Sequence, residues 1–187
     1  MTGSIVIGSR CPRPSSDGWT AGDNSYRRHH MQLVSNSFSD GGRIPVRHAM
    51  KAIQGGANVS PHLKITGVPT GAASLAIAFV DRHPMARQWV HLLVTGLAAG
   101  DIEVPEGASI SGMPQGCREL VNTFGFRGYG GPQPPHGSGV HRYELAVYAL
   151  SALPDVGDRE LSEKAFLELV KNKVLAKSAI TGGFENS

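Results

Sequence analysis

The sequence predicts a mainly β domain, a sandwich or another compact β-structure, with one helix near its C-terminal end. Three short runs, residues 75–80, 89–94 and 145–150, are apolar at both odd and even positions. Such runs, bounded by turn formers, are typical of central strands that are covered on both faces. The 24 glycines and 12 prolines favour many turns over a helical bundle. Residues 158–170, in contrast, show the spacing of an amphipathic helix.

The composition is that of one ordinary globular domain. The chain has 187 residues, of which 40% are hydrophobic and 18% charged, enough for a single sizeable core. Its net charge of +3 is mild and no basic stripe interleaved with aromatic residues accompanies it, so no nucleic-acid partner is expected. Cys11 and Cys117 have neither metal-ligand nor disulfide spacing. Without a long apolar run or a signal-peptide core, we expect a cytoplasmic protein with no stable membrane insertion.

Residues 1–30 differ from the rest of the chain. They are polar, rich in turn formers and without a period of 2 or 3.6, which predicts a flexible N-terminal extension. A misassigned upstream start, with Met31 as the true first residue, would give the same pattern. A basic interaction tail around Arg27 and Arg28 is the alternative. Residues 31–187 are predicted to form a single domain.

From Met31 onward the chain is predicted to form short strands between turns. Residues 31–38 form the first strand, and the Asp-Gly-Gly at 40–42 is a turn signal. The proline within 44–46 suits an edge strand rather than a central one. Residues 63–65 alternate in polarity as a half-buried strand does, and the glycines and proline of 67–71 turn the chain again.

The C-terminal part is predicted to be helical. Asp158 is expected to cap this helix, while Glu160 and Glu163 favour the positive end of its dipole. Residues 174–180 suit one further short element. The apolar stripe of the helix consists of Leu161, Ala165, Phe166, Leu169 and Val170.

Strand alternation places three ionisable side chains on inward-facing sides of the three apolar strands. Successive residues of a strand point to opposite faces, so every second residue shares a face. Asp81 ends one such face, His91 lies within a second, and His141 begins a third. The three faces are Leu75-x-Ile77-x-Phe79-x-Asp81, Trp89-x-His91-x-Leu93 and His141-x-Tyr143-x-Leu145-x-Val147.

Each of these groups also has an ordinary explanation, because a buried polar side chain usually finds a partner within the core. The segment before His141 favours a shared site instead. Residues 128–143 hold five glycines and three prolines in sixteen positions, a composition that forms a rigid, shaped loop. Binding groups concentrate on loops that a scaffold holds in place. We therefore expect Asp81, His91 and His141 to form one site, with this loop as a wall.

Eight short motifs occur in one order along the chain. They are SFxDGGxIP at 37–45, NVSPxL at 58–63, GVPTG at 67–71, DxxP at 81–84, WVH at 89–91, PEG at 105–107, GYxGPxPPxG at 128–137 and HRY at 141–143. A single motif such as WVH is a weak signal, but the ordered set is specific. The chain resembles the phosphatidylethanolamine-binding protein (PEBP) family, also called the Raf kinase inhibitor protein family, and most of all its bacterial and archaeal YbhB/YbcL-like branch. The resemblance covers about residues 31–184.

This resemblance implies a PEBP-like β-sandwich with one large antiparallel sheet, one smaller sheet and a C-terminal helix. It also implies a small, solvent-open pocket for a small phosphorylated or carboxylate ligand, with no metal and no cofactor, and it allows a homodimer. Carried over by motif, the ligand-binding residues are Asp81, Trp89, His91, Tyr129, Gly131, Pro132 and His141.

The chemistry of these residues suits an anion. Imidazole N–H groups of His91 and His141 can donate to ligand oxygens, and backbone N–H groups of the glycine-rich loop can add donors. Asp81 is expected to orient a histidine or to accept from an ammonium group. Where the family has Asp-Pro-Asp-x-Pro, this chain has Arg82 and His83 after Asp81, so a more basic pocket mouth is expected.

Three functions are compatible with this sequence. The first is a binding protein without catalysis, since no serine or cysteine motif accompanies the histidines. The second is a hydrolase that uses Asp81, His91 and His141 as acid–base groups or metal ligands, with His83 or His136 in addition. The third is a regulator that resembles a kinase or protease inhibitor and binds a protein partner through the pocket rim.

Overall fold

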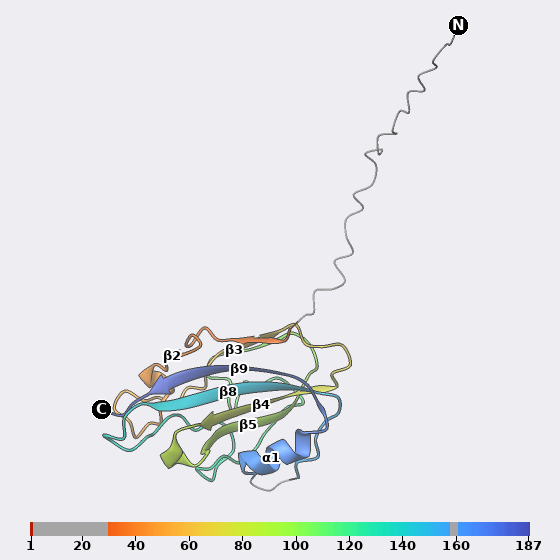
Figure 1. Cartoon of the computed structure of the whole chain (residues 1–187). Coiled ribbons are helices and arrows are strands. Elements are labelled where there is room, and N and C mark those ends of the chain that lie inside the picture. Colours follow the sequence, from red (N-terminus) through yellow and green to blue (C-terminus); the bar gives the residue numbers. More distant parts are fainter. Residues whose placement is uncertain (2–29, 158–160) are drawn as a thin grey trace.

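The computed structural model describes residue 1, residues 30–157 and residues 161–187. The extension predicted at 1–30 therefore lies almost wholly outside the described residues. The described chain forms two β-sheets and one α-helix (Figure 1). The predicted sandwich of one large and one smaller sheet with a C-terminal helix is confirmed.

The large sheet has six strands in the order β2-β9-β8-β4-β5-β7. All neighbouring pairs are antiparallel except β2 with β9. The three apolar runs form its centre, and every residue of β4 is buried, as a strand covered on both faces requires. The strands are β2 (Gly42–Arg43), β4 (Ser74–Asp81), β5 (Val90–Leu97), β7 (Arg118–Glu119), β8 (His141–Leu150) and β9 (Val174–Phe184).

The small sheet has three strands in the order β1-β3-β6, and both pairs are antiparallel. Its central strand β3 (Leu63–Thr66) buries Leu63 and Ile65 and exposes Lys64, so the predicted alternation is confirmed. The first strand, β1 (Gln32–Val34), is shorter than the range 31–38 that we predicted. The third strand is β6 (Ile102–Val104).

Two element boundaries differ from the prediction. The edge strand lies at β2 rather than at 44–46, and Pro45 instead precedes a short 3₁₀ helix, Val46–His48. A proline suits that position because its fixed φ and missing N–H do not disturb a helix start. The last strand, β9, continues through Gly182 and Gly183 because β8 supplies a partner along its whole length.

The helix begins later than predicted. It spans Glu163–Val170 (α1), and its N-cap is Ser162, whose hydroxyl accepts from the N–H of Ala165 at 3.2 Å. The predicted cap, Asp158, lies outside the described residues together with Glu160. A serine directly before the first helical residue satisfies a free N–H of the first turn as well as an aspartate does.

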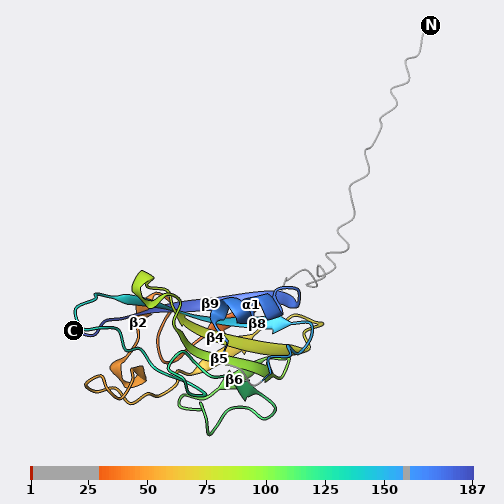
Figure 2. The same ribbon diagram turned by 90° about the horizontal axis from the view of Figure 1, so that it is seen from below.

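The large sheet carries a hydrophobic cluster on each face. Residues of β4 alternate between them, so that Ile77 and Phe79 pack toward the small sheet, while Ala78 and Val80 pack toward α1. Figure 2 shows α1 lying against this second face, where its Phe166 is fully buried. No helix in the described ranges has the length and apolar character that crossing a membrane requires.

Candidate ligand-binding site

The three predicted ionisable residues come together at one end of the large sheet. Asp81 is the last residue of β4 and pairs in register with Tyr143, while His141 is the first residue of β8. His91 is the second residue of β5. Because β4 ends where β5 and β8 begin, the antiparallel order brings all three to the end of the sheet near the C-terminus (Figure 1).

A cavity of about 370 Å³ opens beside these residues. Four of the seven predicted ligand-binding residues line it, namely Asp81, Trp89, His91 and His141. A volume of this size suits a small molecule. The complete lining is Asp81, Met85, Ala86, Trp89, His91, Phe124, Gln133, Pro134, Pro135, His141 and Tyr143.

Asp81 and His141 form a buried pair. The distance between His141 Nδ1 and Asp81 Oδ2 is 2.6 Å, and the two side chains are 2% and 5% exposed, respectively. The other oxygen of Asp81, Oδ1, accepts from the backbone N–H of His83 at 2.8 Å. Both carboxylate oxygens therefore have protein partners, and Asp81 orients the imidazole, as we predicted.

Ser138 determines which protons His141 carries. Its hydroxyl lies 2.6 Å from the carbonyl of Pro135 and 3.1 Å from His141 Nε2. A carbonyl only accepts, so the single hydroxyl proton lies toward Pro135 and the serine oxygen accepts from Nε2–H. A second proton lies in the bond between Nδ1 and Asp81 Oδ2.

His83 covers one face of the His141 ring. The two imidazoles stack with their centroids 3.9 Å apart and an angle of 19° between their planes. Nδ1 of His83 accepts from the backbone N–H of Met85 at 3.4 Å. His83 therefore lies over the paired histidine and is not among the cavity-lining residues.

Arg82 does not contribute to a basic pocket mouth, contrary to our expectation. It points to the opposite face of the sheet, where it makes bonds of 2.5 and 2.6 Å to Glu163 of α1 and one of 3.2 Å to Glu144. These bonds, above all those to Glu163, raise the pKa of Arg82 beyond its usual range. The mouth lacks this charge because Arg82, the residue directly after β4, points to the side opposite Asp81.

The ring nitrogen Nε2 carries a proton in His141 but not in His91. Its Nδ1 lies 2.5 Å from the carbonyl of Gly130, so Nδ1 must be the nitrogen that carries the proton. The N–H of Gly130 returns a bond of 2.9 Å to the carbonyl of His91. Burial lowers the pKa of His91 from 6.5 to about 4. At neutral pH the imidazole is therefore uncharged, and Nε2 presents a lone pair.

The face we predicted for His91 is wrong in one respect. In the pairing of β4 with β5, Phe79 lies opposite Leu92 and Val80 lies opposite Val90, so His91 is the extra residue of a β-bulge. The bulge turns His91 toward Phe79, with ring centroids 5.7 Å apart, while Leu93 packs on the opposite face. Bulges often redirect side chains beside functional sites.

Tyr143 is a cavity residue that the prediction of ligand-binding residues omitted. Its hydroxyl is buried and has no hydrogen-bond partner among the described residues. Burial, reinforced by the nearby carboxylate of Asp81, raises the pKa of Tyr143 far above its ordinary value, so the hydroxyl is a donor. The carboxylate makes no hydrogen bond of normal geometry with it. The alternation His141-x-Tyr143 already placed both residues on one face and could have identified it.

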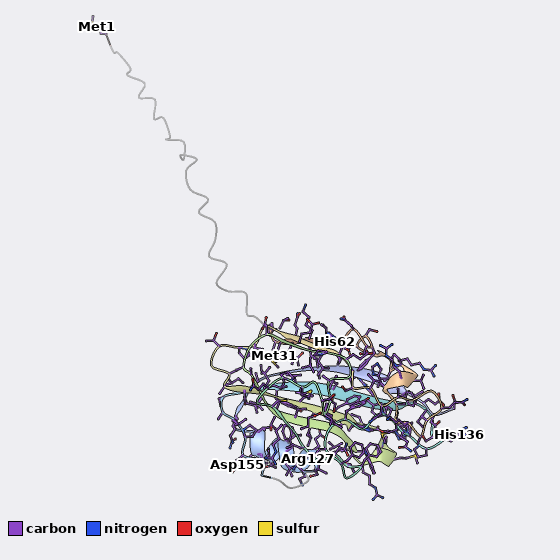
Figure 3. All side chains as sticks on the ribbon, turned by 180° about the vertical axis from the view of Figure 1, so that it is seen from behind. Met1, Met31, His62, Arg127, His136 and Asp155 are labelled. Carbon is purple, nitrogen blue, oxygen red and sulfur yellow. The ribbon has the colours of Figure 1, made fainter. Side chains whose placement is uncertain are left out.

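Three predicted loop residues lie behind the wall of the cavity and do not line it. The ring of Tyr129 stacks on Phe79, and its hydroxyl donates to the carbonyl of His48. Gly131 packs so closely that an added Cβ would lie 2.0 Å from that same carbonyl oxygen. Pro132 accepts from the N–H of Met50 at 3.1 Å. Figure 3 shows His136 of the same loop at one end of the domain and Asp155 at the other.

The backbone N–H groups of the first four loop residues, 128–131, already have protein partners. The N–H of Gly128 donates to the carbonyl of Leu120, and those of Tyr129, Gly130 and Gly131 donate to Ser109 Oγ, the carbonyl of His91 and Asn58 Oδ1. The next residue is a proline and has no N–H. This part of the loop therefore shapes the cavity without supplying donors, and the hydroxyl of Tyr143 on β8 is a buried donor without a partner at the cavity wall.

A metal site does not emerge from this geometry. Among the residues that the structure describes, no three His, Cys, Asp or Glu side chains are placed to hold one ion. His91 and His141 each use one ring nitrogen to bond a protein oxygen. Cys117, which is free, lies outside the cavity lining.

Comparison with known proteins identifies relatives along nearly the whole described chain. Residues 34–185 match the family model described as phosphatidylethanolamine-binding protein. A UPF0098 protein of Methanothermobacter thermautotrophicus is 34% identical over 153 residues, which cover 81% of this chain and 97% of the relative. The UPF0098 protein YbhB of Escherichia coli is 34% identical over 162 residues, or 82% of this chain and 99% of YbhB. The crystal structure of Escherichia coli YbcL, described as a new member of the mammalian PEBP family, has a TM-score of 0.77 and 28% identity and covers 84% of this chain and 99% of YbcL.

Proposed function

The chain belongs to the phosphatidylethanolamine-binding protein family, and on that premise we propose that it binds a small phosphorylated or carboxylate molecule in the cavity beside Asp81 and His141, without converting it. The observation that carries this proposal is the hydroxyl of Tyr143, a buried donor without a partner at the cavity wall. Leaving such a donor unsatisfied costs about 1–3 kcal/mol. A ligand oxygen that accepts from it removes this cost.

The rest of the lining suits the carbon part of a ligand. Trp89, Phe124, Pro134 and Pro135 contribute apolar surface, and hydrophobic walls with few polar groups are typical of small-molecule sites. Nε2–H of His141 is a second donor, because a ligand oxygen can take the place of the half-buried Ser138 hydroxyl. The site thus combines two hydrogen-bond donors, Tyr143 and His141, with an apolar lining.

The lining also supports binding rather than turnover. None of the described residues that line the cavity is Ser, Thr, Cys or Lys, the usual activated nucleophiles. Asp81 has both oxygens committed to protein N–H groups. A hydrolase acting through the histidines, or a regulator that binds a kinase or protease at the rim, has no better support in this geometry. A homodimer and a cytoplasmic location remain predictions.

Calorimetric titration with phenyl phosphate tests the proposal. We expect one binding site, and Tyr143→Phe should weaken it by about tenfold or more, because a hydrogen bond to a charged ligand contributes about 1.5–3 kcal/mol. Tyr148→Phe is the matched control, since Tyr148 lies on the same strand with its ring against Phe166 on the other face. Unchanged binding in Tyr143→Phe, or release of phenol from phenyl phosphate, would contradict the proposal.

A further inference from the structure

The two histidines of the cavity offer a ligand different atoms. His141 presents an N–H at Nε2, since its partners Asp81 and Ser138 both accept from the ring. His91 has its only proton on Nδ1, bonded to the carbonyl of Gly130, and its Nε2 has no protein partner in the described ranges. The ring nitrogen that remains for a ligand at His91 is therefore an acceptor.

The groups around His91 do not reverse this assignment. Burial lowers the pKa of His91, and it outweighs the backbone of Gly130 and Gly131 and the carboxylate of Asp81, which favour protonation, while His141 at the start of β8 opposes it. Tyr143, also from β8, is held as a neutral phenol. The remaining ring neighbours, Phe79 and Phe124, carry no charge.

No cation from the cavity lining balances a doubly charged ligand. The ionisable residues of the lining are Asp81, His91, His141 and Tyr143, and no lysine or arginine is among the described residues that line the cavity. Arg82, the nearest arginine in sequence, is bonded to Glu163 on the other face. A phosphate dianion, whose oxygens are all acceptors, would meet the lone pair of His91 with a lone pair of its own.

We propose that the cavity selects a phosphomonoester in its singly charged form, with the P–OH group donating to His91 Nε2 while the other oxygens accept from Tyr143 and His141. This inference rests on the proposed function and narrows its ligand class. No covalent bond changes. The bound complex holds one proton more than the free protein and the free dianion, and solvent supplies it.

The chemistry of oxyanions explains why a phosphomonoester fits best. Its second ionisation has a pKa of about 6, so roughly a tenth of it carries the proton at pH 7. A carboxylic acid with a pKa of about 4.3 is protonated about fifty times less often at that pH. Sulfate monoesters and phosphodiesters have the same single charge as the phosphomonoester monoanion but carry no proton.

Calorimetry of phenyl phosphate at pH 7.5, in two buffers with different protonation enthalpies, measures the proton directly. We expect close to one proton taken up per ligand, and an association constant that falls about tenfold per pH unit between pH 7 and 9. Phenyl sulfate, matched in shape and charge, should bind at least about tenfold more weakly at pH 6.5. Equal binding of the two ligands, or binding without proton uptake, would overturn the inference.

A comparison of head groups distinguishes a free monoester from a lipid head group. Phosphoethanolamine carries a P–OH at pH 6, whereas glycerophosphoethanolamine is a diester and does not. We expect the monoester to bind more tightly, and equal or tighter binding of the diester would overturn the inference. If none of these phosphorylated ligands binds at any pH, the proposed function itself fails, which is a different outcome from binding without a proton.

The variant His91→Gln tests the residue. The side-chain amide of glutamine can donate a hydrogen bond at the position of the His91 Nε2 lone pair. Ligand binding should then take up no proton, and the affinity for phenyl sulfate should rise at least about tenfold relative to that for phenyl phosphate. His62→Gln is the control, because His62 bonds Glu103 beside the small sheet and should behave as the unmodified protein does. Undiminished proton uptake in folded His91→Gln would overturn the assignment. If that variant does not fold, the sulfate comparison in the unmodified protein still decides the matter.

Discussion

The two faces of the large sheet end in polar clusters of different kinds. On the face toward α1, Arg82 bonds Glu163 and Glu144, and Lys177 adds a bond of 2.9 Å to Glu144. Each charge in this helix-side cluster has an opposite charge beside it. A partly buried polar network whose members are all paired favours one arrangement of the chain.

The cavity side is only partly satisfied. Asp81 and His141 satisfy one another, but the buried hydroxyl of Tyr143 has no hydrogen-bond partner in the described part of the chain. The stability of the fold does not explain this group, because an unpaired buried polar atom costs free energy. A buried hydroxyl without a hydrogen-bond partner, rather than an unpaired charge, therefore distinguishes the ligand-binding end of this sheet.

The largest predicted effect is on acid stability and comes from His91. Above pH 6.5 its ring is neutral in both the folded and the unfolded chain. Between pH 6.5 and about 4 the unfolded chain takes up a proton that the folded chain does not. The free energy of unfolding should therefore fall as the pH falls, by about 3 kcal/mol from this residue alone. Urea titrations at pH 7 and pH 4 measure this change.

The matching variant is His91→Gln, which does not titrate and should lose less stability over the same pH interval. An equal loss in both proteins would show that His91 is not the neutral, buried imidazole described above.

The next largest effect should come from the helix-side cluster. Glu163→Ala removes the carboxylate that binds Arg82 and leaves a half-buried guanidinium without its main partner, so we expect a loss of about 2 kcal/mol in the free energy of unfolding. Phenyl phosphate binding should not change. Glu168→Ala on the exposed side of α1 is the control, because its pair with Lys171 is exposed and worth well under about 1 kcal/mol. A loss of ligand binding in Glu163→Ala would mean that the two faces are coupled.

The smallest effect has the opposite sign. Tyr143→Phe removes an unsatisfied hydroxyl and should raise the free energy of unfolding of the ligand-free protein by about 1 kcal/mol, even though it weakens binding. Tyr148→Phe should change stability by less than about 0.5 kcal/mol. Thermal unfolding of both variants without ligand measures the difference. Destabilisation by Tyr143→Phe would indicate that this hydroxyl has a partner within the protein.

Much of the fold could be predicted because its strongest signals are local. The runs at 75–80 and 145–150 became β4 and β8, and alternation placed Asp81 and His141 on one face, where they form a pair. Glycine and proline content identified the loop at 128–143 as a shaped wall. In each case, burial on both faces or restricted backbone angles leave a mark on the residues themselves.

The remaining features depend on partners far away in the chain. The bulge at His91 follows from the register with β4, which alternation within β5 does not reveal. The partner of Arg82 lies 81 residues ahead, at Glu163, so a charge next to Asp81 was wrongly placed at the pocket mouth. Likewise, Gly131 donates to Asn58, 73 residues away, and the N–H groups of residues 128–131 are all bonded within the protein.

The central claim is that Gly130 and Asp81 give the two cavity histidines opposite hydrogen-bonding roles. Nitrogen-15 NMR of the imidazole rings in the ligand-free protein at pH 7 tests it most directly, with His91→Gln and His141→Gln for assignment. The account predicts that His91 carries its proton on Nδ1 and a lone pair on Nε2, and that His141 carries a proton on Nε2 and shares a second with Asp81. A proton on Nε2 of His91, or an unprotonated Nε2 in His141, would contradict the account.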